Sequence, residues 1–160
     1  LGDINILVSF ALLPALGTFF VAVGAYDPQS LLMILPIGLI TVAILHANNT
    51  RDVKTDLQAG LGTITTSVSL MNAKAIYTFE IFAPYALALL YVVLLGQPWT
   101  LLAVVLTLPL ALRNVRTMIQ AEDDLPYRGI QRLDQTTAQL QMAFGLLYAL
   151  GFFLGSWLGV

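Results

Sequence analysis

The sequence predicts an all-α integral membrane protein, built as a bundle of about five transmembrane helices. Of its 160 residues, 58% are hydrophobic and only 10% are charged, whereas a soluble domain is about 25% charged. The hydrophobic residues also gather in long runs, and an α-helix needs roughly 20 apolar residues to cross a hydrocarbon core about 30 Å thick. Five such runs occupy residues 4–25, 30–47, 76–95, 99–118 and 140–160.

Turn-forming residues separate these runs, and proline and glycine mark positions within them. Asp27-Pro28 ends the first run, and the sequence 96–98 (Gly-Gln-Pro) closes the third. Prolines lie inside four of the runs, at Pro14, Pro36, Pro84 and Pro109. Neighbouring helices in a membrane bundle can satisfy the carbonyl groups that a proline frees, so these prolines predict kinks rather than helix ends. Glycine recurs at every fourth position of the last run, at Gly151, Gly155 and Gly159. This spacing predicts close helix packing.

Basic residues are confined to one side of the predicted bundle. Two connections are long and polar, residues 48–72 and 113–139, and five spans place both on the same side. All seven basic residues lie in or beside them: Arg51, Lys54, Lys74, Arg113, Arg116, Arg128 and Arg132. Since connections rich in lysine and arginine remain in the cytoplasm, we expect both polar segments to be cytoplasmic.

Composition excludes several other kinds of function. The formal net charge of −2 argues against a nucleic-acid partner, which needs a basic surface. The chain has no cysteine, which excludes disulfides, thiolate metal sites and cysteine nucleophiles. One histidine, His46, is too few for a multi-histidine zinc site.

A candidate metal site follows the second apolar run. Asn49, Asp52 and Asp56 are spaced i, i+3 and i+7, so they share one face if the helix continues. Carboxylate and amide oxygens suit Mg²⁺, which completes its coordination shell with water and substrate phosphate. We therefore predict Mg²⁺ at Asp52, Asp56 and Asn49, with Asn48 and Arg51 contacting substrate phosphate. The alternative for this bare pattern is a solvated helix face.

The segment 48–63, NNTRDxxxDxxAGxxT, resembles the second aspartate-rich motif of the UbiA superfamily of intramembrane prenyltransferases. Its NNxRD form is similar to the MenA-like branch, which prenylates naphthoquinone precursors. Shorter similarities to that branch lie at 1–3 (LGD), 113–116 (RxxR) and 145–151 (GLLYxxG). Residues 61, 62 and 67 depart from the basic pattern of many bacterial members, and animal-type members are similarly apolar at the first two of these positions.

This resemblance implies that residues 1–160 form the C-terminal part of a UbiA-like domain, the second part of a bundle of about nine helices. The implied reaction is Mg²⁺-dependent transfer of a polyprenyl group from prenyl diphosphate to an aromatic quinone precursor, of the 1,4-dihydroxy-2-naphthoate or menadiol type, in menaquinone biosynthesis. Asp52 and Asp56 are the implied catalytic residues. The implied partners are the lipid bilayer, both substrates and an N-terminal half that carries the first aspartate-rich motif. Two alternatives remain open: another acceptor such as 4-hydroxybenzoate, and a non-catalytic membrane binding subunit.

Several further polar residues have alternative interpretations. Glu80, inside the third run, is expected to pair with Lys74 or to act as a base towards the acceptor. Tyr77 is expected in an interfacial aromatic belt or beside the developing cation, and His46 is expected to form a hydrogen bond at a helix end. Arg113 and Arg116 are expected to bind lipid or substrate phosphate or to anchor the topology. The acidic run 122–124 is expected to be a solvated loop.

Overall fold

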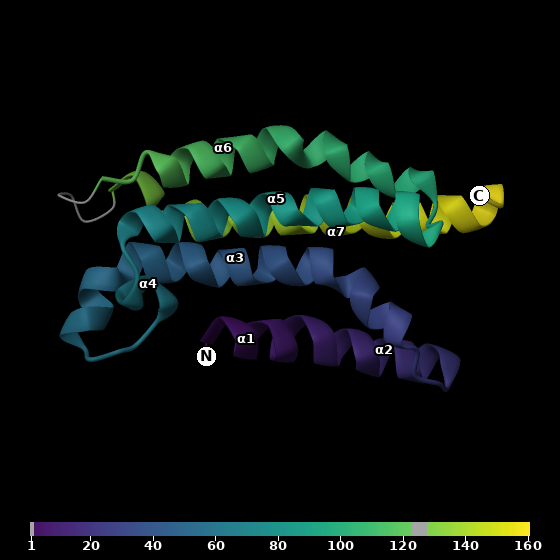
Figure 1. Ribbon diagram of the computed structural model, residues 1–160, viewed down its shortest axis with the longest axis horizontal. Coiled ribbons are helices and arrows are strands. Elements are labelled where there is room, and N and C mark those ends of the chain that lie inside the picture. Colours follow the sequence, from purple (N-terminus) through teal and green to yellow (C-terminus); the bar gives the residue numbers. More distant parts are fainter. Residues whose placement is uncertain (1, 123–127) are drawn as a thin grey trace.

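The computed structural model describes residues 2–122 and 128–160, and over these residues it contains helices and no strand. Five helical rods lie side by side along the long axis of the molecule (Figure 1). The helices in chain order are α1 (Gly2–Leu7), the π-helix η1 (Val8–Leu12), α2 (Leu13–Val23), α3 (Pro28–Gln58), α4 (Ile64–Ser67), α5 (Leu70–Leu95), the 3₁₀-helix η2 (Trp99–Thr107), α6 (Leu108–Ile119), the 3₁₀-turn η3 (Arg128–Ile130) and α7 (Leu133–Leu158).

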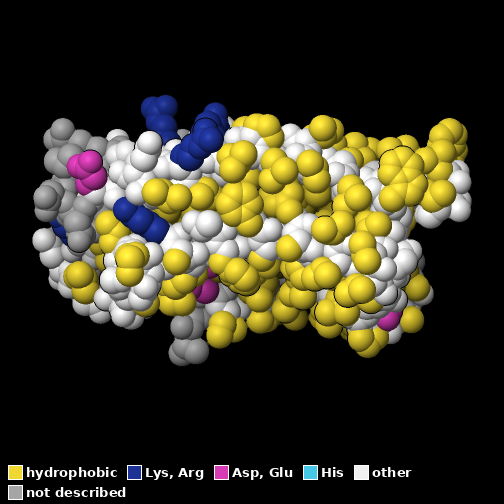
Figure 2. Space-filling model, turned by 45° about the horizontal axis from the view of Figure 1, so that its top comes forward, with side chains coloured by type: hydrophobic (Ala, Val, Ile, Leu, Met, Phe, Trp, Pro, Cys, Tyr) yellow, Lys and Arg dark blue, Asp and Glu magenta, His cyan; other side chains and the backbone are white. Residues whose placement is uncertain are grey.

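Each rod is long and apolar enough to cross a membrane. The rods are Gly2–Val23, Pro28–Gln58, Leu70–Leu95, Trp99–Ile119 and Leu133–Leu158. The prediction of an all-α, multi-pass membrane bundle is therefore confirmed. The two long connections, which contain α4 and η3, lie at the same end of the bundle (Figure 1). Lysine and arginine side chains gather towards that end on the face shown in Figure 2, while hydrophobic side chains cover most of the rest.

The predicted boundaries of the polar segments are wrong, because much of both segments is helical. Helix α3 continues for about three turns beyond residue 47 and ends at Gln58. No proline or glycine interrupts residues 48–58, and the helix stops only where Gly60 adopts a positive φ of 69°. In the second segment, α6 extends to Ile119 and α7 begins at Leu133.

Two of the four prolines lie where the helix type changes. Pro14 is in the first turn of α2, directly after the π-helix η1, and Pro109 is in the first turn of α6, directly after the 3₁₀-helix η2. A proline lacks an N–H group and its ring crowds the carbonyl four residues earlier, so the preceding turn widens or tightens instead of staying α-helical.

The other two prolines, Pro36 in α3 and Pro84 in α5, lie inside unbroken helices. Pro36 cannot donate to the carbonyl of Leu32, the residue four positions earlier. The hydroxyl of Tyr91 in α5 donates to that carbonyl at 2.6 Å. A neighbouring helix thus supplies the hydrogen bond that Pro36 removes, as expected for a membrane bundle.

Helix α3 is the centre of the packing, since it contacts α5, α7 and the α1–η1 rod. Small residues allow two of the closest approaches. A Cβ atom on Gly38 would lie 2.7 Å from Leu7 Cδ1 of α1, and one on Gly151 of α7 would lie 2.9 Å from Leu101 Cα of η2. Gly155 is tighter still, since an added Cβ would lie even closer to Pro98 Cβ, whereas Gly159 ends α7 in open space. The predicted glycine packing is therefore confirmed for the first two members of the series only.

We expect Gly151→Ala to destabilise the protein by about 1–3 kcal/mol, because the added methyl meets the backbone of η2, which cannot move aside as a side chain can. Thermal unfolding in detergent measures this effect. The matched control is Gly145→Ala in the same helix, where a Cβ meets nothing within 4 Å and alanine favours the helix by about 1 kcal/mol. Equal melting temperatures for the two variants would contradict the proposed contact.

Candidate functional site

The polar end of α3 carries the predicted metal ligands on one face. Because the helix runs unbroken to Gln58, Asn49, Asp52 and Asp56 share a face, as the spacing predicts, and the two aspartates are about 40° apart around the axis. All three side chains are partly exposed. Asp52 and Asp56 therefore point in similar directions, one turn apart, beyond the apolar part of the helix.

Arg51 connects this face to helix α7. Its Nε and one Nη donate to the two carboxylate oxygens of Asp52, each at 2.8 Å, and the same Nη also donates to Asn48 Oδ1. Its other Nη donates to Asp134 Oδ2 at 2.9 Å and, at 3.5 Å, to the carbonyl oxygen of Gln131. The ion pairs are partly buried, with side-chain exposures of 27% for Arg51, 37% for Asp52 and 22% for Asp134.

Asp134 is the residue that the sequence reasoning missed. It lies 83 residues from Arg51 along the chain, so no local spacing predicts the contact. The available signal was its place in the first turn of α7, where a carboxylate is favoured by the helix dipole. Its Oδ1 accepts from the backbone N–H of Gln135 at 2.9 Å, while Oδ2 faces Arg51.

The donor set at this face fits part of a Mg²⁺ site. A carboxylate has about four acceptor positions, so Asp52 retains free lone pairs after pairing with Arg51. Asp56 adds a second carboxylate and Asn49 an amide oxygen, and Mg²⁺ commonly takes one or two carboxylates with water and phosphate. Within the described ranges, no group of three or more histidine and acidic residues is arranged to hold a metal. Asp52, Asp56 and Asn49 alone therefore do not form a full cage for such an ion.

The structure does not bring Arg113 and Arg116 to this face. Both side chains are exposed on α6, whose main packing partners are α7, α5 and η2. The opposite side of the same helix is buried through Asn114, Val115 and Met118. These arginines therefore point away from the core of the bundle.

Comparison with known proteins identifies the family. Residues 1–129 match the model of the UbiA prenyltransferase family. The chain belongs to the UbiA prenyltransferase family. It is similar to UbiA prenyltransferase domain-containing protein 1 of Gallus gallus (33% identity, 96% of this chain and 44% of the relative), Xenopus tropicalis (34%, 96% and 42%) and Homo sapiens (32%, 96% and 43%). The chain thus spans less than half the length of these relatives. Membership supports prenyl transfer in general.

In this UbiA family member, a buried polar cluster lies deeper in the bundle. His46 Nδ1 is 3.6 Å from Glu80 Oε1, and both side chains are almost fully buried. The predicted pairing of Glu80 with Lys74 is wrong, because the two residues lie on different sides of α5. Lys74 Nζ instead donates to the backbone oxygens of Ile119 and Ala121, at 2.9 and 2.5 Å. His46 is likewise inside α3 rather than at its end.

Tyr77 belongs to the same buried region, and its placement in an interfacial belt is wrong. Its side chain is 0% exposed, and its hydroxyl lies 2.6 Å from Thr137 Oγ1 of α7. Thr137 donates its own hydrogen to the carbonyl of Leu133 at 2.6 Å, so Tyr77 is the donor in the pair. This bond joins α5 to α7 in the core.

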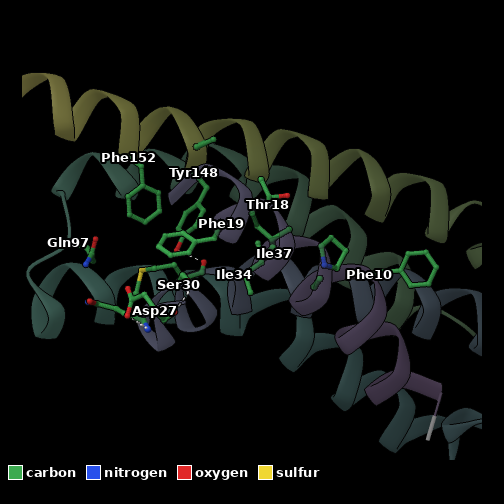
Figure 3. Close-up of a pocket in the computed structure, with 17 residues that line it drawn as sticks. Phe10, Thr18, Phe19, Asp27, Ser30, Ile34, Ile37, Gln97, Tyr148 and Phe152 are labelled. Atoms are coloured by element: carbon green, nitrogen blue, oxygen red, sulfur yellow. Dashed lines mark hydrogen bonds between the residues drawn. The ribbon is translucent and has the colours of Figure 1, made fainter. Parts of the chain in front are cut away.

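In the part of the chain that the structure describes, two cavities flank α3, and neither is lined by Asp52 or Asp56. The larger, of about 810 Å³, lies between α2, α3 and α7; Phe10, Phe19, Tyr148 and Phe152 line it, and Asp27, Ser30 and Gln97 lie at one end (Figure 3). Its nearest α3 residue, Ile37, is about 22 Å along the helix from Asp52. The smaller, of about 370 Å³, lies between the end of α3, α4 and the start of α5.

The acidic run 122–124 is only partly described. Glu122 is exposed, in agreement with a solvated position, whereas Asp123 and Asp124 lie outside the described residues, as do Leu1 of the LGD segment and the side chain of Arg128.

We expect Tyr77→Phe to cost about 1 kcal/mol of stability, because it removes one buried hydrogen bond and leaves the bond from Thr137 to Leu133 intact. The control is Tyr26→Phe, which removes the hydroxyl of a tyrosine that is 68% exposed. Thermal unfolding of the two purified variants in the same detergent measures the difference. An effect of equal size in both would show that the bond to Thr137 contributes nothing.

Proposed function

We propose that the complete protein transfers a polyprenyl group from prenyl diphosphate to an aromatic quinone precursor of the 1,4-dihydroxy-2-naphthoate or menadiol type, with Mg²⁺, in menaquinone biosynthesis. The observation that carries this proposal is the pair Asp52 and Asp56 on one face of α3, in a segment that the family model covers. The NNxRD form of that segment supports the naphthoquinone type of acceptor.

In this proposal residues 1–160 are the C-terminal part of the catalytic domain. The relatives are more than twice as long as this chain, and an N-terminal half with a first aspartate-rich motif would complete the metal site. Asp52, Asp56 and Asn49 would hold Mg²⁺. Bound there, Mg²⁺ would stabilise the negative charge that develops on the departing diphosphate.

The residues of this chain bind and orient the reactants. The apolar helices surround the prenyl chain and keep water from the reacting carbon. Asn48 contacts the diphosphate end of the substrate, and its own side chain is held by the hydrogen bond from Arg51. The allylic C–O bond breaks, a bond to the aromatic ring forms, and the ring loses a proton or its carboxyl group. Arg113 and Arg116, on the exposed side of α6, anchor the cytoplasmic side of the protein against lipid phosphate.

We expect Asp52→Asn and Asp56→Asn each to lower prenyl transfer by about 100-fold or more, because each removes a negatively charged metal ligand. The assay supplies geranylgeranyl diphosphate, a naphthoquinol acceptor and Mg²⁺ to the complete protein in detergent, and product is measured by chromatography. Chelation of Mg²⁺ with EDTA is expected to abolish the same activity. Glu122→Gln, an exposed carboxylate on a connection, is the matched control.

Near-normal Mg²⁺-dependent turnover in either aspartate variant would overturn this assignment. Turnover with 4-hydroxybenzoate but not with the naphthoquinol would assign another acceptor to the same site. Binding of prenyl diphosphate without turnover on any acceptor would indicate a non-catalytic membrane protein.

A further inference from the structure

We propose that Asp134 of α7 is a positioning residue for the metal site, and that Arg51, which it holds, positions Asp52 and Asn48 instead of binding substrate phosphate. This inference rests on the proposed function, since the site that is positioned is the proposed Mg²⁺ site. It assigns a role to a residue outside the aspartate-rich segment and a different role to the arginine within it.

The first argument is the use of the guanidinium donors. An arginine side chain has five N–H donors and no acceptor. The structure provides five acceptors for them within the chain: both oxygens of Asp52, the amide oxygen of Asn48, Asp134 Oδ2 and the carbonyl of Gln131. A phosphate oxygen would have to displace one of these partners, so direct phosphate binding is not the role that this geometry favours.

The second argument is the shape of the pairing with Asp52. Arg51 and Asp52 are consecutive in a helix, and consecutive side chains diverge by about 100° around the axis. The guanidinium therefore reaches Asp52 only when its long side chain folds back along the helix surface. An unsupported arginine would lose that geometry, because holding such a side chain in one rotamer costs up to about 2 kcal/mol of conformational entropy.

The third argument is that Asp134 is itself fixed. One carboxylate oxygen accepts from the backbone N–H of Gln135 in the first turn of α7, and the other accepts from Arg51. Helix α7 in turn packs against α3 along the bundle. The carboxylate is therefore a rigid anchor, and it holds the far side of the guanidinium while the near side holds Asp52.

The consequence for metal binding concerns orientation more than charge. Arg51 takes one lone pair from each oxygen of Asp52 and leaves the other two in a fixed direction. Partners that orient a metal ligand in this way commonly change metal affinity or activity by about 10–100-fold when they are removed. Asp134 acts through Arg51 and does not touch the metal.

The test measures metal dependence in the complete protein with Asp134→Asn, Asp134→Glu and Arg51→Lys. We expect Asp134→Asn to raise the Mg²⁺ concentration for half-maximal prenyl transfer by about ten-fold or more, with the KM for the aromatic acceptor unchanged. Asp134→Glu keeps the charge and is expected to recover most of the loss. Arg51→Lys keeps a positive charge but lacks the planar fork, so it is expected to raise the Mg²⁺ concentration for half-maximal prenyl transfer as Asp134→Asn does.

A second readout separates this inference from the proposed function. Binding of Mn²⁺ in the presence of inorganic diphosphate is measured by electron paramagnetic resonance, which needs no turnover. Glu122→Gln is the control for loss of a carboxylate, and thermal unfolding checks that each variant is folded. If the protein turns over no acceptor but Asp134→Asn still weakens Mn²⁺ binding relative to Glu122→Gln, the proposed reaction fails and the positioning role stands.

Two outcomes would overturn the positioning role. One is a folded Asp134→Asn protein whose Mg²⁺ dependence and Mn²⁺ affinity match those of the unmodified protein. The other is an Arg51→Lys protein that changes only the KM for prenyl diphosphate, which would make Arg51 a phosphate ligand. Should Asp134→Asn fail to fold, Arg51→Lys alone decides the test, because it removes the same fork of hydrogen bonds between Asp134 and Asp52.

Discussion

The direction of every candidate metal ligand in this chain depends on the rotation of one helix, α3. Ile40, Ala43 and Ala47 are at most 1% exposed, so α3 cannot turn about its axis without unpacking the core. Because the helix is unbroken to Gln58, that fixed rotation extends to Asp52 and Asp56. The apolar core therefore sets where two exposed carboxylates point, although none of its atoms touches them.

Hydroxyl groups hold the rods in this arrangement without adding charge to the core. Tyr91 donates to the carbonyl that Pro36 leaves unpaired, Tyr148 donates to the carbonyl of Met33, and Thr100 donates to the carbonyl of Gly151. An unsatisfied polar group is costly where water is absent, so these bonds stabilise the segment of α3 around Pro36 and the close contact between η2 and α7. Helix α7 also carries Tyr148 and Phe152, two of the aromatic residues that line the larger cavity (Figure 3).

Local patterns in the sequence predicted the membrane rods and the shared face of Asn49, Asp52 and Asp56, because both depend only on composition and helical spacing. They did not predict where α3 ends, since polar residues 48–58 form a helix as readily as a loop until Gly60 interrupts it. They also misplaced the partners of Glu80 and Lys74. Those partners come from α3 and from the end of α6, and such contacts depend on how the helices pack.

The contrast between local patterns and helix packing also applies to Asp134, which meets Arg51 through packing although the two residues are 83 positions apart in the sequence. Two carboxylates one turn apart repel each other, and the adjacent Arg51 pairs with one of them, Asp52. The fold adds Asp134, so that two carboxylates, those of Asp52 and Asp134, pair with one guanidinium. A divalent cation held by Asp52 and Asp56 would relieve the repulsion between those two side chains. An arginine bound only to Asp52 would compete with the metal for it, whereas an arginine also held by α7 is kept on one side of the carboxylate and leaves the other side open.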